Sequence, residues 1–290
     1  MAERADLRVA IDVRSGRTVL ATVRGTELID TRRLEHAGPP SPQVLADAVA
    51  VLRERAPGEI AAIGAVWRHQ GHVAMAEAAP LREVLAAVQG LTGLACHLLP
   101  FGAALALGEW LRAPSPGPLA VLTLDVAVAG GVVIDGAPFM PHRLDLGHLS
   151  VAADGPKCRC GGRGCLDALA SERAIVALSR DLDLSLEAPS DDDWQTLMVS
   201  HLAELERESV RQTVVLVEHA GRAIGLAAAQ LAGVLGVTEV RLRTRHPATW
   251  RSLQPAAEHA LRAACGPLLP RLVPAHASED AFFVGAVRHF

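Results

Sequence analysis

The chain has 290 residues, a formal net charge of -4 and five cysteines, and half of its residues are hydrophobic. This length suits one large domain or two smaller ones, and no uninterrupted apolar run reaches the ~20 residues of a membrane-spanning helix. The small negative charge gives no general attraction to nucleic acid or anionic membranes. Because the charged start runs directly into a strand-like segment, we expect no signal peptide, no membrane association and a cytoplasmic location.

The N-terminal part of the chain alternates short apolar segments with turn residues, which predicts strands and helices in succession. Ser41 and Pro42 suit the N-cap and first turn of a helix, because serine accepts from free backbone N–H groups and proline needs no intrahelical partner there. The elements predicted before residue 113 are strands at 7–12, 17–23, 28–34 and 60–66 and helices at about 42–55, 80–92 and 102–112.

The segment from Ala113 to Pro118 contains three prolines, and we place a domain boundary there. Beyond it the strand pattern restarts, so the second part repeats the theme of the first. Its predicted elements are strands at 119–124, 131–136 and 239–243 and helices at about 167–180, 191–206, 209–235 and 252–265. This alternation indicates an α/β fold with domains 1–113 and 114–290 and a cleft between them, and the C-terminal helix can return to the first domain.

Four metal-binding side chains gather within eighteen residues, namely His148, Cys158, Cys160 and Cys165. One imidazole and three thiolates are a common ligand set of a tetrahedral structural zinc ion. A disulfide fits less well, because cysteines at these spacings do not easily form an unstrained bridge. Since protein side chains fill all four positions, none is open for an activated water, and we expect a structural zinc.

The residues around this cluster resemble a known family. Asp145-Leu-Gly-His148 and Cys158-x-Cys160-Gly-x-x-Gly-Cys165-Leu-Asp167 are similar to the E-x-G-H and C-x-C-G-x-x-G-C-x-E signatures of the ROK family, which groups bacterial sugar kinases and sugar-responsive repressors. Further similarity lies at 103–109, 131–136 and 284–286. The resemblance implies a two-domain, actin-like sugar-kinase (ribonuclease H-like) fold with an interdomain cleft and a zinc loop over 148–165.

The same resemblance implies roles for three side chains. His148 would bind zinc through one ring nitrogen and face a sugar with the other. Asp145 and Asp167 stand where the family places sugar-binding glutamates, and each is one methylene shorter. These three residues are therefore the first candidates for ligand binding.

The phosphate loops depart from the family's patterns. The first, D-x-G-G-T in the family, reads Asp12-Val-Arg14-Ser-Gly here, and Arg14 puts a long side chain where the backbone must approach a phosphate. The second, G-T-G-x-G-x-G in the family, corresponds to residues 125–131, and Asp125 with branched apolar residues suits an anion poorly. We therefore do not expect ATP or Mg²⁺ as cofactors.

The family's general base also has no counterpart. Counting back from Glu109 places Phe101 at the base aspartate of the N-D-A-N motif, and phenylalanine cannot accept a proton. The turn that receives adenosine corresponds to residues 241–247, and the loop beside the sugar corresponds to residues 67–71. Phe101 and Trp67 would make the ligand pocket more apolar than a plain hexose prefers.

Other charged residues have a structural interpretation beside the functional one. Asp12 suits a strand end, with contact to a cation as the alternative. His69, His72 and His142 could act as replacement acid or base groups, although loop histidines are commonly just exposed. The basic run over 241–251 is interpreted as a solvated loop or a subunit contact rather than an anion site.

These observations favour a catalytically impaired, zinc-containing ROK-type protein that binds a sugar or modified small molecule in a regulatory or scaffolding role. One alternative is an enzyme with non-kinase chemistry in the inherited sugar cleft, and another is an ATP-dependent, glucokinase-like sugar kinase. A repressor would carry a helix-turn-helix domain before the first strand, so we expect no direct DNA binding. The resemblance implies a homodimer.

Overall fold

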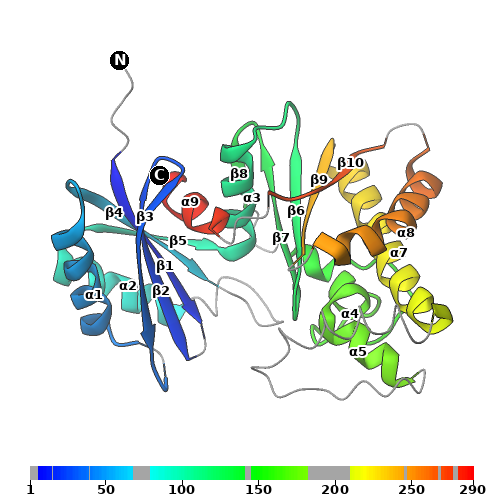
Figure 1. The fold of residues 1–290 in the computed structure, drawn as a ribbon, viewed down its shortest axis with the longest axis horizontal. Coiled ribbons are helices and arrows are strands. Elements are labelled where there is room, and N and C mark those ends of the chain that lie inside the picture. The colour runs from blue at the N-terminus through cyan, green and yellow to red at the C-terminus, as the bar shows by residue number, and fades with distance from the viewer. Residues whose placement is uncertain are drawn as a thin grey trace. The chain divides into compact units, whose positions relative to one another are not determined.

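The computed structural model describes residues 6–14, 16–38, 40–67, 79–140, 145–181, 210–244, 247–266, 269–276 and 280–290. They form an α/β structure with two five-stranded sheets (Figure 1), which confirms the predicted fold class. The helix predicted over 191–206 and the histidines His69, His72 and His142 lie outside these residues.

The chain forms two compact units. The first comprises residues 1–116, 131–144 and 278–290, and the second comprises residues 117–130 and 145–277. The boundary predicted between residues 113 and 114 lies close to Pro116, where the chain first leaves the first unit. The segment 131–144 and the C-terminal segment group with the first unit, so each unit is built from separate stretches of sequence.

The sheet of the first unit has the strand order β3-β2-β1-β4-β5, in which β1 is antiparallel to β2 and parallel to β4. Strands β2 and β3 are antiparallel and β4 and β5 are parallel. The strands are β1 (Leu7–Arg14), β2 (Arg17–Arg24), β3 (Glu27–Glu35), β4 (Ile60–Trp67) and β5 (Ala95–Pro100). The carboxyl ends of β1, β4 and β5 therefore meet at one edge of the sheet.

Helices pack against both faces of this sheet (Figure 1), namely α1 (Pro42–Arg55), α2 (Ala79–Thr92), α3 (Phe101–Arg112) and α9 (Ala281–Arg288). Ser41 caps α1 by accepting from the Val44 N–H, as predicted. Alternate residues of β1, including Val9 and Ile11, share a buried core with α1 and α2. The opposite face receives the C-terminal helix, because a Cβ at Gly64 would lie only 2.0 Å from the carbonyl oxygen of Ala286.

The second sheet has the order β10-β9-β6-β7-β8. Its strands are β6 (Leu119–Leu124), β7 (Val128–Ile134), β8 (Ala137–Phe139), β9 (Glu239–Thr244) and β10 (Arg271–Pro274). All of β6 is buried, and β6, β9 and β10 are mutually parallel, which suits strands covered on both faces. Of this sheet, β6, β9 and β10 belong to the second unit, whereas β8 and most of β7 group with the first. The second unit contains the short helices η1 (Leu146–His148) and α4 (Leu166–Ala170) and the longer α5 (Glu172–Asp181), α7 (Val210–Leu235) and α8 (Pro247–Cys265).

Several predicted boundaries differ from the structure. The single helix predicted over 167–180 is two helices, because Ser171 has an extended backbone and its hydroxyl accepts from the Ala174 N–H as the start of α5. Helix α8 begins at Pro247 rather than near residue 252, and β7 begins at Val128. The strands β5, β8 and β10 were missed, and β8 and β10 have only three and four residues, which carry little periodic signal.

The interpretation of the basic run over 241–251 as a solvated loop or subunit contact is wrong for Arg241. Arg241 lies in β9, is 4 % exposed, and places its Nε 2.7 Å from Oε1 of Glu239. Residues two apart on a strand share a face, so the guanidinium and the carboxylate meet inside the sheet layer. Arg251 belongs to α8.

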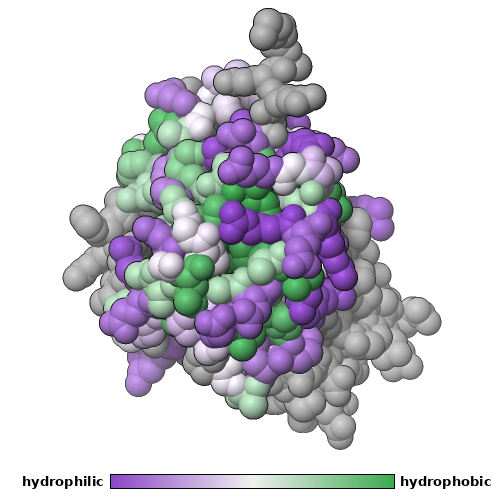
Figure 2. All heavy atoms as spheres, turned by 90° about the vertical axis from the view of Figure 1, so that its left-hand side faces the viewer, coloured by the Kyte–Doolittle hydropathy of each residue, from purple (hydrophilic) through white to green (hydrophobic). Residues whose placement is uncertain are grey.

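Hydrophobic side chains are exposed singly in the first unit, for example Val44 and Leu91. Figure 2 shows one face of the molecule, on which hydrophilic residues are interspersed with smaller hydrophobic patches. Among the described residues, no helix combines the length and apolar character needed to span a membrane.

Candidate metal and ligand site

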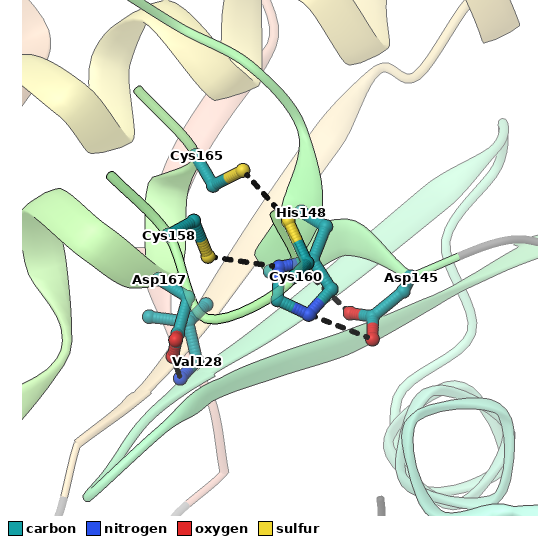
Figure 3. A network of polar contacts seen from close by, with 8 residues as sticks. Val128, Asp145, His148, Cys158, Cys160, Cys165 and Asp167 are labelled. Carbon is teal, nitrogen blue, oxygen red and sulfur yellow. Dashed lines mark hydrogen bonds and ion pairs between the residues drawn. The ribbon is translucent and has the colours of Figure 1, made fainter. Parts of the chain in front are cut away.

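The four residues predicted to bind zinc lie together in the second unit (Figure 3). One ligand atom from each of His148, Cys158, Cys160 and Cys165 lies within 4.8 Å of all the others. Nδ1 of His148 is 3.5 Å from Sγ of Cys158, and Sγ of Cys160 is 3.5 Å from Sγ of Cys165. The structure thus brings together the whole predicted ligand set.

The loop that carries the cysteines is held by its own backbone. Gly164 has a φ of +60°, and a Cβ there would lie 1.6 Å from the carbonyl oxygen of Ala152, so only glycine fits. Its N–H donates to Pro156 and its carbonyl accepts from Val151. From the neighbouring helix α7, Gln230 Nε2 donates to the carbonyl of Ser150 at 2.9 Å. The loop is therefore preorganised around the cluster.

The three thiols respond differently to this environment. Burial raises the pKa of Cys158 and of Cys165, and in Cys165 hydrogen bonds with the other two thiols raise it further. Burial also acts to raise the pKa of Cys160, but the backbone at Gly162 and the other thiols hydrogen-bond its sulfur and lower the pKa overall. Three adjacent thiolates become stable only with a cation between them, because their charges repel.

These side chains fit a zinc ion. Tetrahedral zinc with Zn–S bonds of about 2.3 Å places its sulfur ligands about 3.8 Å apart, close to the 3.5 Å between Sγ of Cys160 and Sγ of Cys165. The shorter Zn–N bond of about 2.0–2.1 Å suits the 3.5 Å between Nδ1 of His148 and Sγ of Cys158. Three soft sulfur donors and one imidazole are also the donor chemistry that zinc prefers. Cys158 and Cys165 are buried, so the site is closed in the manner of a structural metal centre.

The second ring nitrogen of His148 faces a carboxylate. Nε2 lies 3.7 Å from Oδ2 of Asp145, while Oδ1 of Asp145 accepts from the Gly147 N–H at 3.0 Å. The side chain of Asp145 is 33 % exposed and that of His148 is 17 % exposed. Together they present a carboxylate and an imidazole edge that can hydrogen-bond the hydroxyl groups of a small polar molecule.

Asp167, the third candidate, is placed differently. Its side chain is buried in the first turn of α4, and Oδ1 accepts from the backbone N–H of Val128 at 2.8 Å (Figure 3). Val128 follows the turn of residues 125–127, which joins β6 to β7 and lies in the predicted second phosphate loop. Within this turn the Val126 N–H donates to Oδ1 of Asp125 at 2.7 Å. Carboxylates of the chain itself therefore accept from two of the loop's amides.

The candidates in the first unit gather at the carboxyl ends of its parallel strands. Val13 pairs with Trp67, and Trp67 pairs with Pro100, which precedes Phe101 at the start of α3. The backbone of Trp67 thus lies beside the segment that leads into Phe101. This edge of a parallel sheet is where α/β proteins commonly bind ligands.

Two side chains at this edge contact other side chains of the first unit. Asp12 is fully buried, and its Oδ2 lies 2.6 Å from Nε of Arg14. Phe101 is 7 % exposed and its ring lies 5.3 Å from that of Phe282 in α9. Phe282 in turn contacts the ring of Phe283 at 4.2 Å. Phe101 is therefore part of an aromatic cluster that joins α3 to α9.

Sequence reasoning did not single out Gly147 and Val128 as parts of the site. A Cβ at Gly147 would lie 2.2 Å from the carbonyl oxygen of Val128, so this glycine lets the Asp145–His148 segment lie against the start of β7. The glycine directly before the ligand histidine in the D-x-G-H motif was the only available signal. Val128 carried none, because its contribution is a backbone amide.

Comparison with known proteins gives a consistent result. Residues 102–288, more than half of the chain, match the model of the ROK family. An N-acetylmannosamine kinase from Vibrio cholerae serotype O1 is 27% identical over 215 residues, which cover 73% of this chain and 70% of that protein.

Solved structures show the same fold. A ROK hexokinase from Thermus thermophilus superposes with a TM-score of 0.77 at 23% identity, covering 97% of this chain and 96% of that one. A ROK family transcriptional regulator, a homologue of the E. coli MLC protein, superposes with a TM-score of 0.76 at 17% identity, covering 97% of this chain and 77% of that one. Kinases and regulators thus share this architecture.

Proposed function

We propose that this chain, which belongs to the ROK family, is a zinc-containing sugar-binding protein with impaired phosphoryl transfer that acts in a regulatory or scaffolding role. The observation that carries the proposal is the burial of Phe101, at the family's general-base position, against Phe282. N-acetylmannosamine is the first sugar to test, because a relative at 27% identity is named as its kinase.

The sugar-binding part of the proposal rests on Asp145 and His148. Their partly exposed polar atoms lie 3.7 Å apart, a separation at which one sugar hydroxyl can donate to the carboxylate while another contacts the imidazole. A zinc ion held by Nδ1 of His148 and the three sulfurs would fix the orientation of the ring. The ligand would then meet a rigid polar edge.

The impairment of phosphoryl transfer rests first on the missing base. A phenyl ring accepts no proton from a sugar hydroxyl, and the loss of a general base typically reduces a rate by about 10²- to 10⁴-fold. Phe101 also cannot easily give way to a substitute group, because its ring is part of the α3–α9 packing. The first residue of α3 is therefore part of the hydrophobic core.

Phosphate binding would meet a second difficulty. The backbone N–H groups of Val126 and Val128, which could cradle a phosphate, instead donate to the carboxylates of Asp125 and Asp167. These carboxylates would repel an incoming anion. In the first unit the carboxylate of Asp12 already contacts the guanidinium of Arg14, which reduces its attraction for Mg²⁺. ATP would therefore bind weakly.

Calorimetry with N-acetylmannosamine, glucose and ATP tests this function. We expect saturable binding of one sugar, a loss of at least about tenfold in affinity for Asp145→Ala, and no comparable binding of ATP. Asp154→Ala is the matched control, because Asp154 is an exposed carboxylate of the zinc loop. Failure of every sugar to bind would refute the sugar-binding role.

An active N-acetylmannosamine kinase is the second candidate, favoured by the 27% identity over 73% of the chain. A coupled assay with ATP, Mg²⁺ and the sugar separates the two. Turnover within the usual kinase range of about 1–100 s⁻¹ would establish the kinase and overturn the impairment. A homodimeric assembly, which the resemblance implies, and a cytoplasmic location are part of the same proposal.

A further inference from the structure

Two segments of the zinc site contact the same residue, Val128. Asp167 accepts a hydrogen bond from the Val128 N–H at 2.8 Å, and both groups are buried. At the carbonyl of the same residue, Gly147 approaches so closely that a Cβ would lie 2.2 Å from the Val128 oxygen. The backbone of Val128 is therefore held between two short stretches of chain, of which Figure 3 shows the contact with Asp167.

Each of these stretches contains a zinc-binding residue. Gly147 directly precedes His148, and Asp167 lies two residues after Cys165. The stretches are also joined to each other, since the Leu166 N–H donates to the Leu149 carbonyl at 2.9 Å and Ser150 forms a β-bridge with Cys165. An ion shared by His148 and Cys165 would fix the distance between the two contacts to Val128.

We propose that Asp167 is a positioning residue that couples zinc binding to the conformation of the turn at residues 125–127. With zinc bound, the start of α4 is fixed, and the Asp167 carboxylate accepts from Val128 and orders the turn before β7. Without zinc, α4 and the 147–149 segment can separate, and the Val128 N–H loses its acceptor. The turn then opens.

The hydrogen bond from the Val128 N–H to the Asp167 carboxylate is strong enough to order the turn. A buried backbone N–H must have a partner, and a carboxylate accepts more strongly than a neutral oxygen. Asp167 is 6 % exposed, so little water competes for the bond. The shorter aspartate, in place of the family's glutamate, thereby serves the backbone of the turn.

Site-resolved amide hydrogen exchange at Val128 tests the coupling in the full chain. In the zinc-loaded protein we expect Asp167→Leu to raise the exchange rate at least about tenfold, with zinc still bound in a 1:1 ratio. Asp167→Asn should keep slow exchange, because its amide oxygen can still accept. Asp154→Asn is the control for charge on the zinc loop.

Chelation of zinc from the wild-type protein should raise exchange at Val128 as much as Asp167→Leu does, and chelation of the leucine variant should add little. Equal rates in wild type and Asp167→Leu, or an unchanged rate after chelation, would overturn the coupling. Amides of β1 and β4 serve as a reference for global unfolding. The comparison of Asp167→Leu with Asp167→Asn is made on the zinc-loaded protein and needs no chelation. Since neither sugar nor nucleotide is used, the outcome is independent of the proposed function.

Discussion

Arg14 places its Nε 2.6 Å from Oδ2 of Asp12, a fully buried carboxylate near the end of β1. A cationic side chain of the chain thus stands next to the aspartate that the first phosphate loop retains. The resemblance to the D-x-G-G-T loop places Arg14 at a glycine position of that loop. The ion pair affects stability as well as cation binding.

Arg14→Met should lower the free energy of unfolding by about 1–3 kcal/mol, because it removes a cation from beside a buried carboxylate. The double variant Asp12→Asn with Arg14→Met should recover part of this loss, since no buried charge remains. Urea unfolding measures both. Arg55→Met is the control, because Arg55 and Asp30 are 3.9 Å apart and largely solvated, and such pairs contribute little. An equal loss of unfolding free energy in Arg14→Met and in Arg55→Met would contradict the prediction.

The purified chain should contain one zinc ion, and Cys160→Ser should reduce the bound zinc and lower the melting temperature. Serine oxygen is a much poorer zinc ligand than a thiolate, and zinc binding contributes directly to folding. Metal analysis and thermal unfolding measure the two effects. Cys96→Ser provides the control, since Cys96 lies in β5 of the first unit. Full zinc content in the Cys160 variant would show that this sulfur is not a ligand.

Phe101→Ala should destabilise the chain by about 3 kcal/mol, because a buried aromatic ring is removed from contact with Phe282. Phe101→Leu, which keeps most of the volume, should cost less than about 1.5 kcal/mol. Chemical unfolding compares them.

Phe101→Asp should not create kinase activity, although it restores the family's residue. The buried carboxylate would destabilise the α3–α9 contact, and the amides of the 125–127 turn would still be occupied. The measurement is a coupled assay with ATP and N-acetylmannosamine. Efficient turnover by this single variant would show that the missing base alone prevents catalysis.

Stability should fall in acid partly because of Glu239. Burial acts to raise the pKa of this carboxyl, but hydrogen bonds from Arg271 and Arg241 outweigh it, so the folded-state pKa lies below the ordinary value of 4.5. A lowered folded-state pKa gives stability that is present above pH 4.5 and is lost as the pH falls towards the folded-state value.

The variant Glu239→Gln should therefore show a weaker pH dependence below pH 4.5 than the wild type, together with lower stability at pH 7. Glu258→Gln is the control, because the Glu258–Arg262 pair is partly exposed. Unfolding curves collected from pH 3 to pH 7 would contradict the assignment if both variants kept the wild-type slope.

The sequence by itself determined the His/Cys cluster that could hold a metal ion, the family and most of the regular elements. Ligand residues of a metal loop are close in sequence, so the spacing of His148, Cys158, Cys160 and Cys165 carries the geometry directly. The cap at Ser41 and the long helix α7 follow from local capping and periodicity in the same way.

Only the tertiary structure decided how separate stretches meet. No local pattern shows that Asp167 directs its carboxylate to the Val128 amide or that Phe101 packs against Phe282. Each contact joins a side chain to a group whose position depends on sheet register or helix packing, and one of these partners is a backbone amide that every residue except proline carries. For that reason the metal site could be predicted from the sequence, whereas its connection to the β6–β7 turn could not.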